Sequence, residues 1–101
     1  MSNLFLVEIS PTSSDRVTAS VTVAAVQREV ADAGAELIET QITADHGRIF
    51  AILEADSAAT LVEALGNVQA DEISEPAQVR LVGAELEAIK AARPEAGYLV
   101  E

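Results

Sequence analysis

The segment AELIETQITADHGRIFAILE, residues 35–54, decides the fold of this chain. Two runs rich in β-branched and aliphatic residues flank the polar stretch ADHG, residues 44–47, whose Gly47 can adopt turn geometry. This pattern predicts a β-hairpin with strands over residues 35–43 and 48–54, joined by a four-residue loop.

Helices are predicted on either side of the hairpin. Before it, small and aliphatic residues recur at spacings of four and three: Ala19, Val23, Val26, Val30 and Ala33. This spacing predicts one face of a helix over residues 18–33, with Ser14, Asp15 or Thr18 as its N-cap. After the hairpin, a second helix is predicted over residues 58–65.

Two further strands, one before the first helix and one after the second, complete the pattern. The first covers residues 3–9 and is ended by Pro11, and the last covers residues 77–82, after an acidic connection over residues 68–76. The order strand, helix, strand, strand, helix, strand is that of the split βαβ, or ferredoxin-like, α+β fold. Right-handed crossovers then predict an antiparallel sheet of order 4-1-3-2, with both helices on one face.

The end of the chain is surplus to this unit. We assign residues 1–82 to a ferredoxin-like domain and residues 83–101 to an extension, with a short helix over 84–92 and a strand over 97–101. The closing residues Leu-Val-Glu repeat the Leu-Val-Glu of the first strand, either by chance in a chain rich in these residues or as an internal similarity of the fold. The last strand therefore pairs in its own sheet, crosses to a partner chain, or is the remnant of a second repeat.

Side chains alternate across a strand, so each face of the sheet can be assigned. Pairing the hairpin about its loop places Ile42 opposite Ile49 and Ile38 opposite Leu53. The face predicted to lie under the helices comprises Phe5, Val7, Ile9, Ile38, Thr40, Ile42, Ile49, Ala51, Leu53, Val79 and Leu81. The opposite face comprises Leu4, Leu6, Glu8, Leu37, Glu39, Gln41, Arg48, Phe50, Ile52, Glu54, Gln78, Arg80 and Val82.

This opposite face has too many large apolar groups for water and too many charges for an ordinary core. Exposed apolar patches of this kind mark interfaces or ligand grooves. We therefore expect two copies to pack these faces together, as in dimeric α+β barrels, around a partly polar cavity. The side chains expected to line that cavity are Leu6, Glu8, Glu39, Gln41, Phe50, Ile52 and Arg80.

Glu8 is expected at the centre of the mixed face. In one interpretation it forms a cross-strand ion pair with Arg80, and in the other it contacts a ligand. A half-buried carboxylate can serve as a general base, so Glu8 and Glu39 are the candidate catalytic residues, with His46 as a further acid–base group.

His46 is the only histidine and lies in the hairpin loop beside Asp45. The two side chains are either parts of a polar turn or weak candidates for metal ligands. One imidazole alone does not make a closed transition-metal site.

Composition limits the possible partners. The formal net charge of −11 disfavours nucleic acid and anionic membranes, and the absence of cysteine excludes thiolate zinc sites and iron–sulfur clusters. No nucleotide, flavin or haem motif is present in the sequence. No apolar run approaches the roughly 20 residues of a membrane span, and no secretory leader precedes the first strand, so we expect a cytoplasmic protein.

Several of these features occur together in one known group of proteins. The opening Leu-Val-Glu (residues 6–8), the hairpin ITADHGRIF (42–50), a helix capped at Ser57 and the stretch 73–82 resemble a widespread bacterial family of small ferredoxin-like proteins of largely unknown function. The resemblance implies a homodimer with its sheets face to face. Some members are described as nickel-binding, which implies a divalent metal here, with His46 as the imidazole ligand.

Three classes of function remain open at this point. The first is a homodimeric binding module that holds a small molecule or metal ion between its sheets. The second is a cofactor-independent enzyme, similar in fold to muconolactone isomerases and antibiotic-biosynthesis monooxygenases, a likeness that does not fix activity. The third is an assembly or regulatory domain of a longer protein.

Overall fold

A computed structural model describes residues 2–80 of the chain. Its elements follow the order β1 (Asn3–Ser10), α1 (Arg16–Asp32), β2 (Glu36–Ile42), β3 (Ile49–Ala55), α2 (Ala58–Leu65), β4 (Glu72–Ile73) and β5 (Ala77–Val79). The predicted helix over 84–92 and strand over 97–101 lie outside the described residues, as do Leu81 and Val82.

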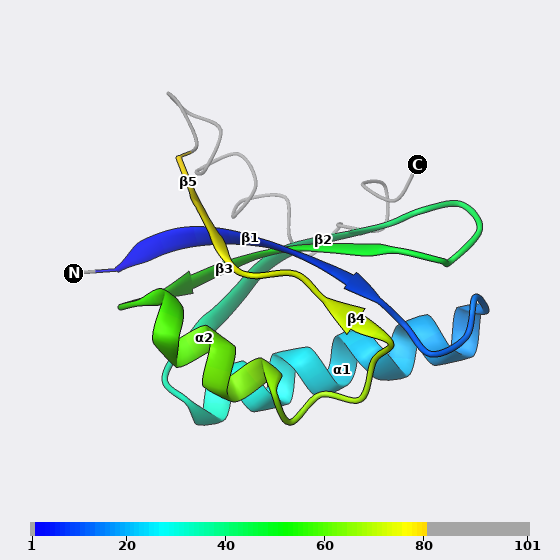
Figure 1. The fold of residues 1–101 in the computed structure, drawn as a ribbon, viewed down its shortest axis with the longest axis horizontal. Coiled ribbons are helices and arrows are strands. Elements are labelled where there is room, and N and C mark those ends of the chain that lie inside the picture. The colour runs from blue at the N-terminus through cyan, green and yellow to red at the C-terminus, as the bar shows by residue number, and fades with distance from the viewer. Residues whose placement is uncertain (1, 81–101) are drawn as a thin grey trace.

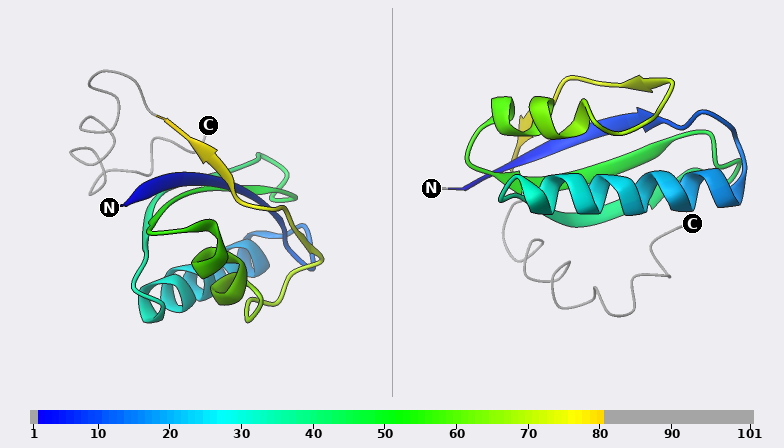
Figure 2. Two further views of the ribbon diagram at one scale, coloured as in Figure 1. Left: turned by 60° about the vertical axis from the view of Figure 1, so that its left-hand side comes forward. Right: turned by 90° about the horizontal axis from the view of Figure 1, so that it is seen from below.

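The predicted ferredoxin-like topology is confirmed. The strands follow the order β2-β3-β1-β4, and every pairing is antiparallel. Both helices lie on the same side of the sheet (Figures 1 and 2). Within the described residues, neither helix has the length and apolar character needed to span a membrane.

The fourth position in the sheet is shared by two short strands. β4 pairs with the end of β1 at Ile9 and Ser10, and β5 pairs with its beginning, at Leu4 to Leu6. The sequence predicted one strand over 77–82 after an acidic connection. β4 lies within that connection and was not predicted, because the residues around it are acidic.

Local sequence explains where the helices begin and end. The Asp15 carboxylate caps α1 by accepting hydrogen bonds from the Thr18 N–H at 2.8 Å and the Thr18 hydroxyl at 2.9 Å. α1 therefore begins two residues earlier than predicted, and it is followed by Gly34 at φ +85°. α2 covers the predicted residues, and the Ser57 hydroxyl accepts from the Thr60 N–H at 3.3 Å.

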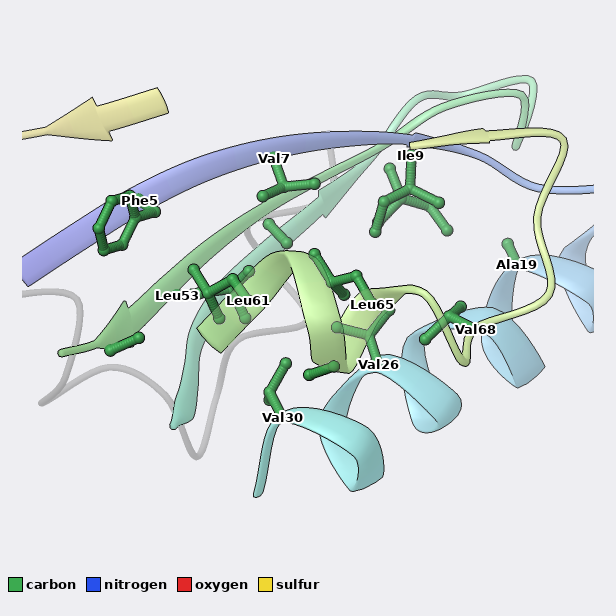
Figure 3. Close-up of a cluster of buried hydrophobic side chains, with 14 residues drawn as sticks. Phe5, Val7, Ile9, Ala19, Val26, Val30, Leu53, Leu61, Leu65 and Val68 are labelled. Carbon is green, nitrogen blue, oxygen red and sulfur yellow. The ribbon is translucent and has the colours of Figure 1, made fainter. Parts of the chain in front are cut away.

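The core lies between the sheet and the helices, as Figure 3 shows. Phe5, Val7 and Ile9 point down from β1 toward the helices. Side chains from β3, α1, α2 and the loop after α2 complete it: Ile49, Ala51, Leu53, Ala55, Ala19, Val26, Val30, Leu61, Ala64, Leu65 and Val68. The core is therefore built almost entirely from aliphatic groups around one phenylalanine.

The predicted pairing of the hairpin holds near its loop and fails beyond a β-bulge. Ile42 opposes Ile49 as expected, but the register shifts between Leu37 and Glu39. Leu37, rather than Ile38, opposes Leu53 and packs against the core. A bulge inserts one extra residue, and this shifts the alternation of side chains by one position.

The predicted faces of Gln78 and Val79 in the last strand are also wrong. Val79 opposes Leu4, on the side turned away from the helices, whereas Gln78 opposes Phe5. Gln78 is exposed, and its amide donates a hydrogen bond to the side-chain oxygen of Asn3 at 3.3 Å. Because Gln78 is exposed at the edge of the sheet and its amide is hydrogen-bonded, a polar side chain is tolerated on the helix-facing side at this position.

Candidate functional site

The candidate site is the side of the sheet turned away from α1 and α2, which we call the distal face. Two rows of opposed residues cross it. One row is Gln41, Phe50 and Glu8, and the next is Glu39, Ile52 and Leu6. The structure thus brings six of the seven predicted cavity residues together, because antiparallel partners point to the same side of a sheet.

The apolar side chains of the distal face keep part of their surface accessible. Leu6 is 36% exposed, and Leu4, Phe50 and Ile52 are half-buried. On the same strands, Val7, Ala51 and Leu53 are fully buried against the helices. The distal face is therefore an incompletely covered apolar surface.

Glu8 forms an ion pair on this face, with Arg48. The Arg48 Nη1 lies 3.2 Å from Glu8 Oε2, and both side chains retain access to solvent. The predicted partner, Arg80, is wrong. Arg48 is two residues from Phe50, the residue opposite Glu8, whereas Arg80 follows β5, which pairs only with the far end of β1.

Ser74 is a neighbour of Glu8 that the sequence did not reveal. The Glu8 N–H donates to Ser74 Oγ at 2.8 Å, and the Ser74 N–H donates to the Glu8 carbonyl at 2.8 Å. A hollow of about 110 Å³ beside them is lined by Glu8, Ser10, Glu72 and Ser74. The only signal was Ile73, an isolated β-branched residue in an acidic stretch, which is too little to predict a strand.

Glu39 occupies a different environment in the neighbouring row. Its side chain is on the distal face opposite Ile52, yet the residue is only 7% exposed. A buried carboxylate beside an apolar patch is unusual, and such groups often have chemical roles. The two candidate catalytic carboxylates are thus on one face but in separate rows.

The hairpin loop is organised by Asp45. Its Oδ1 accepts a hydrogen bond from the Thr43 hydroxyl at 2.7 Å and from the Gly47 N–H at 2.8 Å. The Thr43 hydrogen bond, followed by the Gly47 N–H, lowers the pKa of Asp45 below its ordinary value of 3.8. His46 adopts a left-handed conformation at φ +61°, and its N–H donates to the Thr43 carbonyl at 2.8 Å.

Asp45 and His46, the predicted metal ligands, are adjacent in this loop. The Asp45 carboxylate serves the turn, as the polar-turn interpretation requires. Among the described residues, no three His, Asp or Glu side chains are grouped so that they could hold a metal ion. The structure thus shows a turn role for Asp45, and the metal-ligand role of Asp45 and His46 stays a prediction.

Comparison with known protein families now places the chain. Residues 3–70 match a family described as a domain of unknown function, DUF3303. The chain belongs to the DUF3303 family. The match runs from β1 to the loop after α2, so it includes both rows of the distal face and excludes Ser74 and Arg80.

The DUF3303 match confirms the expected relation to small proteins of unknown function. It carries no information on nickel or on dimers. No curated protein and no solved structure showed significant similarity to the chain.

Proposed function

We propose that this DUF3303 protein is a small homodimeric binding module whose two sheets pack distal face to distal face around a small ligand. One observation carries the proposal: Leu6, Phe50 and Ile52 form a patch that the single chain leaves partly accessible. Burying such a patch against a second copy stabilises the pair by about 25 cal/mol for each Å² of apolar surface removed from water.

The polar groups of the face favour a cavity over a dry interface. Glu8 and Arg48 are both partly exposed. The Ser74 hydroxyl accepts a hydrogen bond from the Glu8 N–H, and Gln41 is in the same row as Glu8. Ligand sites typically combine an apolar lining with a few polar groups that fix orientation. A small molecule with an apolar body and a polar end matches this surface.

The experiment compares oligomeric state across two exposed apolar positions. Size-exclusion chromatography with light scattering is expected to show a dimer for the wild type and a monomer for Leu6→Glu, because the new carboxylate would meet the partner's sheet. The matched control is Val17→Glu on α1, where the side chain is 72% exposed and away from the distal face. This control is expected to remain dimeric.

Two results would contradict the proposal. One is a wild-type protein that is monomeric at tens of micromolar, a concentration at which even modest protein interfaces are populated. The other is a Leu6→Glu variant that dimerises as well as Val17→Glu. Native mass spectrometry of the purified wild type then tests the ligand, since a bound small molecule adds mass that the Leu6→Glu monomer lacks.

A second candidate, an acid–base enzyme of the same dimeric type, is favoured by the burial of Glu39. A carboxylate that is 7% exposed beside a ligand cavity is the kind of group such enzymes use. Incubating a molecule captured by the wild type with wild-type and Glu39→Gln proteins distinguishes the two candidates. Conversion by the wild type alone supports the enzyme, and equal binding without conversion supports the binding module.

A further inference from the structure

A groove lies on the helix side of the molecule, between α2 and the segment that leads into β4 and Pro76. We call it the acidic groove. Its volume is about 320 Å³, at the lower end of the range for ligand pockets. It shares Glu72 and Ser74 with the small hollow near Glu8 but is otherwise separate from the distal face.

The floor of the acidic groove is apolar. Val62 of α2 is 53% exposed and is one of the most exposed large apolar side chains in the described residues. The half-buried Ile73 and Pro76 and the buried Leu65 and Val68 also line the groove. An apolar floor of this kind favours aliphatic side chains of a ligand.

The rim of the acidic groove carries negative charge. Asp71, Glu72 and Glu75 line it and are exposed, and no basic residue is among its lining side chains. The ion pairs formed within the described residues join Arg28 to Glu29 and Arg48 to Glu8, so neither reaches this rim. The rim therefore adds a local negative field to a chain whose net charge is already −11.

We propose that the acidic groove docks a cationic amphipathic segment of a partner protein. Aliphatic side chains of the segment lie on the floor at Val62, Ile73 and Pro76. Its Lys or Arg side chains meet the rim carboxylates at the edge, where complementary charge steers association. A hydrated metal ion would leave the apolar floor without a contact, and nucleic acid would be repelled by the rim.

The test uses a fluorescent peptide in which lysine and leucine alternate, titrated with the full-length protein by fluorescence anisotropy. A lysine–serine peptide of equal length and charge is the matched probe without aliphatic groups. The lysine–leucine peptide is expected to bind at least about tenfold more tightly, because several leucine side chains leave water on the floor.

Protein variants separate the groove from the overall charge. The rim variant is Asp71→Asn, Glu72→Gln and Glu75→Gln, and it is expected to weaken lysine–leucine binding about tenfold. The control variant removes three exposed carboxylates elsewhere, by Asp32→Asn, Asp56→Asn and Glu63→Gln, so both proteins have the same net charge. The control is expected to bind within about twofold of the wild type.

A third variant probes the floor without changing charge. Val62→Gln replaces a largely exposed side chain on a helix and should not impair folding, which a thermal melt checks. It is expected to weaken the lysine–leucine peptide about threefold or more and to leave the lysine–serine peptide unchanged.

Three outcomes would overturn the proposal. In the first, the rim and control variants lose equal affinity, which means binding reflects total charge. In the second, the two peptides bind alike, which means the floor does not contribute. In the third, the lysine–leucine peptide is displaced as oligomers larger than the dimer form at high protein concentration, which assigns the groove to another copy of this chain.

Discussion

The two faces of the same sheet differ sharply, although they are made by alternate residues of the same strands. On β3, Ile49, Ala51 and Leu53 are buried against the helices, whereas Phe50 and Ile52, between them, are only half-buried. The helix-facing side is completed within one chain. The distal face is not completed within one chain, so a partner or ligand is expected to cover it.

The polar groups of the two sides follow the same division. Thr22, buried in α1 on the helix-facing side, donates its hydroxyl to the Thr18 carbonyl of its own helix at 2.8 Å. On the distal face, Glu8 and Arg48 pair with each other but remain partly exposed. The buried Thr22 hydroxyl is thus satisfied within its own helix, whereas Glu8 and Arg48 of the distal face retain hydrogen-bonding capacity for a ligand.

The largest effect is expected from truncating neighbouring residues of β3 that face opposite ways. Leu53→Ala leaves a cavity in the core and should lower the free energy of unfolding by roughly 3 kcal/mol. Ile52→Ala, on the distal face, should lower it by about 1 kcal/mol, because Ile52 is only half-buried. Urea unfolding at low protein concentration, where the chain is monomeric, measures both losses.

Equal losses for Leu53→Ala and Ile52→Ala would contradict the contrast between the faces. Repeating the Ile52→Ala measurement at high protein concentration tests whether two distal faces pack together. If two distal faces pack together, the deficit of this variant relative to wild type grows with concentration, because dimerisation stabilises only the folded state.

The next effect concerns the cap that starts α1 on the helix side. Asp15→Ala removes the acceptor for the Thr18 N–H and should lower the melting temperature by several degrees. Hydrogen bonds from the Thr18 N–H, then from the Ser13 and Thr18 side chains, lower the pKa of Asp15 below its ordinary value of 3.8. The cap is thus fully formed above that value and is lost as the pH falls through the lowered pKa of the folded state.

Thermal melts across the acid range provide the check. The melting temperatures of wild type and Asp15→Ala should converge as the pH falls below 3.8, the ordinary pKa of the Asp15 carboxyl group, and should differ most near neutrality. Asp15→Asn is the matched control, because it keeps an acceptor oxygen without a titrating group. A gap between wild type and Asp15→Ala that is constant with pH would show that the carboxylate charge contributes nothing.

Much of the fold could be predicted because it follows from the spacing of apolar residues along the chain. The hairpin over 35–54, the two helices and the sheet order all follow from runs of apolar residues and their spacing. The β-bulge at Leu37 to Glu39 could not be predicted, because both Leu37 and Ile38 are apolar and either can oppose Leu53. β4 was missed because two residues cannot establish a strand period.

The candidate site was predictable where strands are regular and not where chain segments meet. Alternation alone brought Glu8, Phe50 and Gln41 into one row. Glu8 pairs with Arg48 of the hairpin, whereas the predicted partner Arg80 follows β5, which pairs with Leu4 to Leu6. No pattern in the sequence shows that β4 lies beside the end of β1 and β5 beside its beginning. Ser74 and the acidic groove follow from that same placement.

A smaller effect is expected from the ion pair on the distal face. Glu8→Gln removes the charge that faces Arg48 and should lower the free energy of unfolding by less than about 1 kcal/mol, because the pair is partly exposed. A double-mutant cycle with Arg48→Gln measures the coupling between the two side chains. If Glu8→Gln leaves both dimerisation and ligand mass in native mass spectra unchanged, Glu8 has no role in binding.

The smallest effect is expected at the hairpin loop, where His46 takes a left-handed conformation at φ +61°. His46→Gly relieves the strain of a side chain in that conformation but adds freedom to the unfolded chain, so the two changes should offset to within about 0.5 kcal/mol. Thermal unfolding, with and without nickel chloride, checks this. Because Asp45 is held by Thr43 and Gly47, nickel should raise the melting temperature of neither protein. A nickel-dependent rise in the wild type that His46→Gly abolishes would show that the loop binds metal and would place a functional site at the hairpin rather than on the distal face.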